Sequence, residues 1–131
     1  MPPKPQSVKE ARGLVARALC RWGHPECVDV VALLTSEVVT NALTHGGLLA
    51  AHEDLVINVA CHAGCDGDVI RVDVLDVGRG KPTVGDASGD AVSGRGLVLL
   101  NGLATAWEVL PAGSHKSVSF EVKTGEVTRA V

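Results

Sequence analysis

The chain has 131 residues, of which 46% are hydrophobic and 2% aromatic, and its formal net charge at pH 7 is −3. This length suits a single domain, and the hydrophobic share is large enough for a buried core, which excludes disorder of the chain as a whole. Proteins that bind nucleic acids or anionic membranes usually carry excess positive charge, so the acidic balance argues against both partners. No apolar stretch is long enough to cross a bilayer, and the N-terminal sequence MPPKPQSVKEARG lacks the apolar centre of a signal peptide, so we expect a cytoplasmic protein.

Two long helices are predicted in the first part of the chain. Residues 1–6 are rich in proline and are expected to be loose and flexible. Apolar residues then recur at helical spacing over residues 7–22, until a Gly-His-Pro sequence ends the pattern. A second helix is expected from about residue 27 or 29 to residue 45, where a pair of glycines stops it.

Four strands and a shorter helix are predicted in the second part of the chain. The strands lie at residues 55–61, 69–76, 106–110 and 117–123, and the helix lies at residues 96–104. In the second strand, apolar residues alternate with Arg71 and Asp73, which predicts one buried face and one solvated face. The expected fold class is therefore α+β, a two-layer α/β sandwich in which about three helices cover one face of a mixed, mostly antiparallel sheet.

The four cysteines raise the question of disulfides or zinc. Without an export signal we expect a reducing compartment, so disulfides are not expected. Cys61 and Cys65 have a spacing typical of metal ligands, and His24, which lies between Cys20 and Cys27, could complete a set. However, a structural zinc site usually has two closely spaced pairs, whereas six residues separate Cys20 from Cys27. We therefore interpret the cysteines as small buried hydrophobic residues, and His24 as a surface or turn residue.

Three polar residues lie on one side of the second predicted helix. Glu37, Asn41 and His45 are four residues apart, so their side chains stack above one another, beside the core-facing side of the helix. No lysine or arginine occurs at residues 28–50, so Glu37 has no cation nearby in the sequence. A partly buried carboxylate is costly unless it has a hydrogen-bonding role. Two interpretations stay open at this point: a functional carboxylate, or solvated helix surface.

Two glycine motifs flank a long segment that has no amphipathic period. The first, at residues 76–80 (DVGRG), follows a predicted strand, and the second, at residues 94–97 (GRGL), opens a predicted helix. A helix N-terminus that follows glycines offers free N–H groups and a positive dipole end, which suit phosphate. Arg79, Lys81 and Arg95 add positive charge. Neither the Walker A motif nor the dinucleotide-binding fingerprint fits these positions, and ordinary turn glycines remain the alternative.

Together these motifs resemble the three ATP-binding boxes of the GHKL superfamily, which includes gyrase, Hsp90, histidine kinases and MutL. Residues 36–42 (SEVVTNA) are very similar to the SELVTNA segment of small stand-alone anti-sigma-factor serine kinases, and Trp107 and Lys116 fit the closing part of that family. The resemblance covers about residues 7–123 and implies one domain with the Bergerat ATP-binding fold. It implies an ATP lid at about residues 77–95, and residues 124–131 are left as a C-terminal tail.

The resemblance also implies roles for individual residues. Asn41 would bind the Mg²⁺ that bridges the ATP phosphates, and Glu37 would act as the general base toward a substrate serine. Asp76 would accept a hydrogen bond from the adenine amino group, while Gly78 and Gly80 let the backbone approach the base. The other implied nucleotide contacts are Lys81, Gly94, Arg95, Gly96, Leu97 and, near a position that contacts adenine in the superfamily, Ser117. The chain departs from the family at residues 112–118, where AGSHKSV replaces the usual Gly-Gly-Lys-Thr and a following aromatic residue.

The function that the resemblance implies is that of an ATP- and Mg²⁺-dependent protein serine/threonine kinase. Its substrate would be an anti-sigma-factor antagonist protein in a partner-switching system, and the partner it controls would be a sigma factor. The alternative is a non-catalytic ATP-binding partner-switch protein that sequesters a sigma factor or another regulator. A histidine autokinase is disfavoured, because the chain has no room for a dimerisation helix pair that carries a phosphoacceptor histidine. Relatives are commonly homodimers, so a monomer and a homodimer both stay open.

Overall fold

The computed structural model describes residues 6–44, 54–65, 67–77, 94–112 and 115–125. In chain order the elements are α1 (Gln6–Arg21), the short 3₁₀ helix η1 (Pro25–Cys27), α2 (Val28–Thr44), β1 (Asp54–Gly64), β2 (Gly67–Val77), α4 (Gly94–Leu103), β3 (Ala106–Ala112) and β4 (His115–Lys123). Every helix and strand predicted from the sequence is confirmed to within a few residues at its ends. Within these ranges, no helix combines the length and the apolar character needed to cross a bilayer. The predicted lid and C-terminal tail lie almost entirely outside the described residues.

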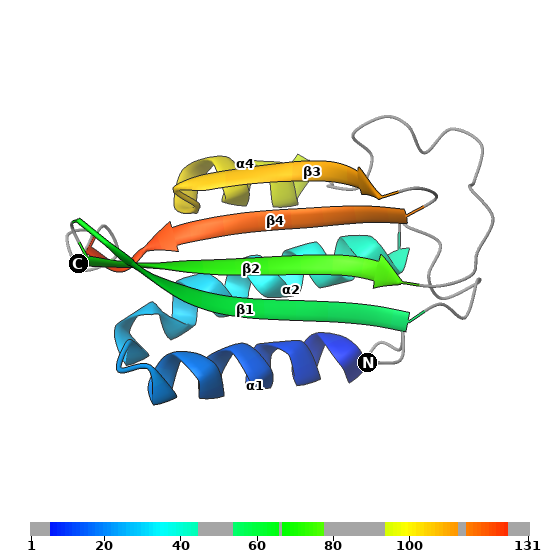
Figure 1. The fold of residues 1–131 in the computed structure, drawn as a ribbon. Helices are drawn as coiled ribbons and strands as arrows, with labels where there is room; N and C mark the ends of the chain where they lie inside the picture. Colours follow the sequence, from blue (N-terminus) through cyan, green and yellow to red (C-terminus); the bar gives the residue numbers. More distant parts are fainter. Residues whose placement is uncertain (1–5, 45–53, 66, 78–93, 113–114, 126–131) are drawn as a thin grey trace.

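The four strands form one sheet in the order β1-β2-β4-β3, and each pairing among them is antiparallel. Figure 1 shows the helices as a second layer, with α2 behind the central strands, α1 on the β1 side and α4 on the β3 side. The predicted two-layer α+β sandwich with helices on one face is therefore confirmed.

Alternation along β2 creates the two different faces of the sheet. Ile70 and Val72 are fully buried, whereas Arg71 and Asp73 are partly exposed. Phe120 of β4 lies beside Val72 and is the largest fully buried side chain of the described residues. The other large side chains that are fully buried are Val15, Leu19, Val31, Leu34, Val38, Val39, Leu55 and Leu100. One continuous apolar core thus joins the sheet to α1, α2 and α4.

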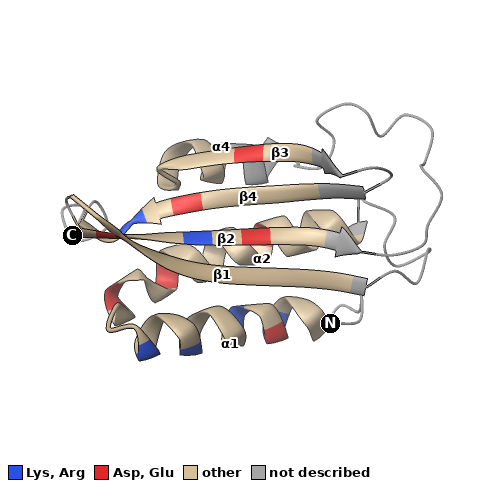
Figure 2. Ribbon diagram, viewed as in Figure 1, with Lys and Arg blue, Asp and Glu red and all other residues tan. Residues whose placement is uncertain are grey.

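The opposite face of the sheet carries a charge cluster around Arg71. The guanidinium group lies 3.0 Å from Asp73, 3.4 Å from Glu108 and 3.6 Å from Glu121. Figure 2 shows acidic and basic positions on each of the neighbouring strands β2 and β4, and an acidic one on β3. Arg71, Asp73 and Glu121 are half-buried and Glu108 is exposed, so the cluster keeps contact with water while its charges pair with one another. The predicted solvated face is confirmed.

The cysteines differ more in burial than the sequence suggests. All four are free thiols; Cys27 is buried and Cys61 is half-buried, but Cys20 and Cys65 are exposed. Burial, together with the nearby Glu26, raises the pKa of the Cys27 thiol to about 11. The interpretation of all four as buried hydrophobic residues is therefore wrong for Cys20, which lies on the outer side of α1, and for Cys65, which lies in the β1–β2 turn.

Two adjacent leucines of α2 test whether the core supplies the stability of the fold. Leu34 is fully buried, whereas Leu33 is 38% exposed. We expect Leu34→Ala to lower the free energy of unfolding by about 2–5 kcal/mol, because it removes buried methyl groups and leaves a cavity. The same change at Leu33 should cost less than about 1 kcal/mol. Urea denaturation of both variants measures the difference, and equal losses would contradict this packing.

Candidate functional site

Helix α2 carries the first two predicted site residues, Glu37 and Asn41. It is rich in valine and threonine, which are poor helix formers in isolation, so its stability comes mainly from burial of one face. That face packs against α1, β2 and α4. Glu37 and Asn41 are one helical turn apart in the second half of the helix; Glu37 is half-buried and Asn41 is only 3% exposed. The third member of the predicted stripe, His45, lies outside the described residues.

The amide of Asn41 is the unusual feature of this helix. Its Nδ2 atom is buried and has no hydrogen-bond partner among the residues that the structure describes. A buried donor without a partner costs about 1–3 kcal/mol, and native proteins rarely keep one without a reason. An anionic oxygen of a bound molecule could accept from Nδ2, while the amide oxygen is a suitable ligand for a hard cation. The Asn41 side chain therefore fits the role of holding a metal–phosphate group.

Those predicted nucleotide contacts outside α2 that the structure describes lie at one end of the sheet. Figure 1 shows that α2 and β2 end, and that α4 and β4 begin, on the same side of the molecule, on the right in this view. Asp76 is the last residue but one of β2. Leu75, which precedes Asp76 in the chain, pairs with Ser117 of β4. The fold thus brings Asp76 and Ser117 onto adjacent strands at this end of the sheet. Ser117, however, lies directly across from Leu75, one position away from the buried pair Val74–Val118, and so on the solvated face of the sheet.

The second glycine motif forms the first turn of α4. Gly94, Arg95, Gly96 and Leu97 open this helix, as predicted, so its N-terminal dipole end faces the same side of the molecule as the end of α2. The structure describes the backbone of Asp76 and of these four residues, but not their side chains. Gly78, Gly80 and Lys81 lie outside the described residues, so their roles stay predictions.

Two further features of the helices were not predicted from the sequence. The Trp107 indole N–H donates to the Asn101 amide oxygen at 2.9 Å, which ties the second half of α4 to β3 and so fixes the direction of the helix. Thr35 of α2 has a buried hydroxyl that, like the Asn41 amide, lacks a partner within the described ranges. The burial of Thr35 could have been predicted, because it stands among the apolar positions of α2. No sequence pattern predicts the hydrogen bond between Asn101 and Trp107.

Comparison with known proteins places this geometry in a family. The sequence matches the histidine kinase-like ATPase domain over residues 1–120. The chain belongs to this family. The resemblance to the GHKL superfamily is thereby confirmed at the level of the histidine kinase-like ATPase domain.

A solved structure supports the same fold. The histidine kinase domain of the blue-light-activated histidine kinase EL346 from Erythrobacter litoralis superposes on this chain with a TM-score of 0.52 at 23% sequence identity. The match covers 98% of this chain and 64% of that structure, so the chain spans less than two thirds of the longer domain. At this identity the likeness concerns the fold alone. No curated protein sequence gave a significant match.

The two buried polar atoms without a hydrogen-bond partner among the described residues, Thr35 Oγ1 and Asn41 Nδ2, predict how substitutions there change the free energy of unfolding. Thr35→Val replaces a buried hydroxyl by a methyl group of similar shape and should raise the free energy of unfolding by about 1 kcal/mol. Asn41→Ala should change it by less than about 1 kcal/mol, because the Nδ2 group that it removes has no hydrogen-bond partner among the described residues. Thr40→Val, the same change at an exposed position of α2, is the control and should bring no gain. Thermal and urea unfolding measure all three; a large loss at Asn41 would show that its amide supports the fold.

Proposed function

We propose that the chain is an ATP- and Mg²⁺-dependent protein serine/threonine kinase of the anti-sigma-factor type. Its substrate is a serine or threonine of a small antagonist protein, and the phosphorylation controls a partner such as a sigma factor. The observation that carries the proposal is the buried Asn41 amide, whose Nδ2 has no hydrogen-bond partner among the described residues. It lies one helical turn after the half-buried Glu37, in a member of the histidine kinase-like ATPase family. The similarity of residues 36–42 to the anti-sigma kinases supports the finer assignment.

The nucleotide-binding part of the proposal rests on the shared end of α2, β2, α4 and β4. The Asn41 amide oxygen would hold Mg²⁺, which neutralises phosphate charge when ATP is bound. The first turn of α4 would face the phosphates with its free N–H groups. The Asp76 carboxylate would accept from the adenine amino group, with Gly78 and Gly80 beside the base.

Glu37 is the residue to which we assign proton transfer. In the proposed reaction the substrate hydroxyl oxygen forms a bond to the γ-phosphorus, the bond from that phosphorus to the β–γ bridging oxygen breaks, and ADP leaves. The hydroxyl proton passes to the Glu37 carboxylate. Two features support this role: Glu37 lies one helical turn before Asn41, and its side chain is half-buried.

Replacing Glu37 should separate binding from chemistry. We expect Glu37→Gln to bind ATP as the wild type does but to transfer phosphate about 10²–10⁴-fold more slowly, because glutamine keeps the shape and cannot take the proton. Calorimetry gives the affinity, and single-turnover labelling gives the rate. Glu10→Gln, at an exposed position of α1, is the matched control. Equal losses of affinity and rate in Glu37→Gln would contradict the assigned role.

Replacing Asp76 should instead weaken ATP binding. A hydrogen bond to a charged group contributes about 1.5–3 kcal/mol, so Asp76→Asn should raise the Kd for ATP about 10-fold or more. Asp73→Asn makes the same change on the same strand, at a residue that pairs with Arg71 on the solvated face, and should leave the Kd unchanged. An unchanged Kd in Asp76→Asn would remove Asp76 from the adenine site.

Phosphate transfer itself tests the kinase assignment. The chain is incubated with γ-labelled ATP, Mg²⁺ and a panel of candidate antagonist proteins, and label stable to acid but removed by alkali identifies phosphoserine or phosphothreonine. Labelling of one antagonist by the wild type, but not by Glu37→Gln, is expected. ATP binding without labelling of any antagonist would favour the non-catalytic partner switch, and acid-labile label on the chain itself would indicate a histidine kinase.

A further inference from the structure

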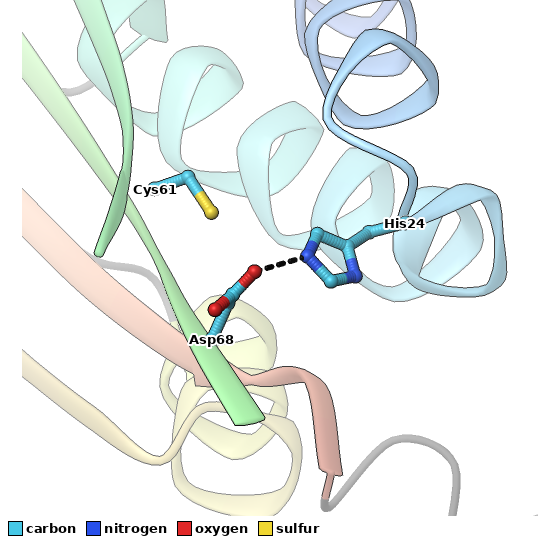
Figure 3. Close-up of side chains that lie close together, drawn as sticks. All are labelled: His24, Cys61 and Asp68. Atoms are coloured by element: carbon cyan, nitrogen blue, oxygen red, sulfur yellow. Dashed lines mark hydrogen bonds and ion pairs between the residues drawn. The ribbon is translucent and has the colours of Figure 1, made fainter. Parts of the chain in front are cut away.

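Three side chains with metal-binding atoms lie together at the end of the sheet that is remote from Asn41. His24 follows α1, Cys61 is on β1 and Asp68 is near the start of β2. Figure 3 shows the three side chains pointing toward one another. One ligand atom from each lies within 4.8 Å of the others, and His24 Nε2 is 2.7 Å from Asp68 Oδ2. Each of the three residues is partly buried.

The fold brings these residues together through strand register. Cys61 pairs with Ile70, and Asp68 is two residues before Ile70, so Cys61 and Asp68 are diagonal neighbours on the helix-facing side of the β1–β2 hairpin. His24 reaches them from the turn between α1 and η1. The sequence suggested His24 and Cys61 as possible ligands but not Asp68, which is 44 positions from His24.

The backbone positions of the cluster are fixed before any ligand arrives. The His24 N–H donates to the Leu19 carbonyl at 2.8 Å, and the His24 carbonyl accepts from the Cys27 N–H at 3.1 Å. The Asp68 N–H donates to the Thr124 hydroxyl at 3.0 Å. Gly67, just before Asp68, has φ of +115°, and a Cβ there would lie 2.8 Å from the same hydroxyl oxygen. A preformed arrangement of this kind lowers the cost of binding.

We propose that His24, Cys61 and Asp68 form a binding site for a zinc-like divalent transition metal. Imidazole, thiolate and carboxylate are the ligands that Zn²⁺ takes, whereas Mg²⁺ and Ca²⁺ prefer oxygen ligands alone. In a tetrahedral zinc site these ligand atoms are about 3.3–3.6 Å apart, so the His24–Asp68 contact must open by about half an ångström. Three protein ligands leave the fourth position to water.

The surroundings of His24 match those of a metal-binding histidine. Glu26 Oε1 lies 3.2 Å from His24 Nδ1, on the ring nitrogen that faces away from the cluster. A carboxylate at the second nitrogen is the usual device that fixes a ligating imidazole, because it holds the proton on Nδ1 and leaves Nε2 free for the metal. Metal binding then displaces the thiol proton of Cys61 and the proton between His24 and Asp68.

The proposed site is separate from the magnesium site assigned to Asn41. Val28, the first residue of α2, and Asn41 are about 20 Å apart along the helix axis, and the His24 cluster lies beyond the Val28 end. The metal would connect the α1–η1 turn to the β1–β2 hairpin and so hold the helix layer against the sheet. Metal binding is therefore expected to raise the free energy of unfolding of the domain.

Zinc titration of the chelator-stripped full chain tests the proposal. We expect one Zn²⁺ per chain by calorimetry, binding at least about 10-fold tighter than Mg²⁺ or Ca²⁺, and a higher unfolding temperature in its presence. Cys61→Ser should weaken zinc binding about 10-fold or more, whereas Cys65→Ser, an exposed cysteine of the same hairpin, should not change it. Absence of zinc binding, or equal binding by Cys61→Ser and the wild type, would overturn the proposal.

Two further measurements do not depend on the folding of Cys61→Ser. Asp68→Asn keeps the shape of the side chain and should also weaken zinc binding about 10-fold or more, because a neutral amide is a poorer ligand. The wild type loaded with Co²⁺ should show a thiolate-to-cobalt charge-transfer band, and Cys65→Ser should retain it. If the wild type showed no such band, or if the band disappeared in Cys65→Ser, Cys61 would be excluded as the ligand.

Discussion

Packing of one face of α2 against the apolar side of the sheet is the contact on which the rest of the molecule depends. The sheet has a single face to bury, and Ile70 and Val72 of β2 meet the helix layer there. Because α2 is rich in β-branched residues, it needs this contact to remain helical. The same contact buries the Asn41 amide at one end of the helix and holds the other end beside the His24 turn.

Much of this arrangement was predictable, because it follows from local pattern. Alternation in β2 identified the buried face, glycines marked the helix ends, and the spacing of Glu37 and Asn41 placed both on one side of α2. What failed depended on distant contacts. The exposure of Cys20 and Cys65, the Asn101–Trp107 hydrogen bond and the His24–Cys61–Asp68 cluster depend on helix orientation and strand register, which no local spacing encodes.

The two ends of the sheet illustrate one physical rule. A domain gains stability by burying apolar groups, so partly or fully buried polar groups mark positions where another requirement overrides packing. At one end, the buried Asn41 Nδ2 has no hydrogen-bond partner among the described residues, and we propose that the nucleotide binds there. At the other end, His24, Cys61 and Asp68 place metal-binding atoms between the two layers. The charge cluster around Arg71 differs from both, since it lies on the face of the sheet that the helices leave open and its charges pair with one another.

The central claim is that Asn41 couples Mg²⁺ to nucleotide binding, and the most direct test is the Kd for ATP measured with Mg²⁺ and with excess chelator. The account predicts that chelation weakens ATP binding by the wild type about 10-fold or more, since Mg²⁺ held by the Asn41 amide oxygen would neutralise phosphate charge. The Asn41→Ala variant should bind ATP weakly both with Mg²⁺ and with excess chelator. An equal Kd with and without Mg²⁺ in the wild type, or full Mg²⁺ dependence in Asn41→Ala, would contradict the account.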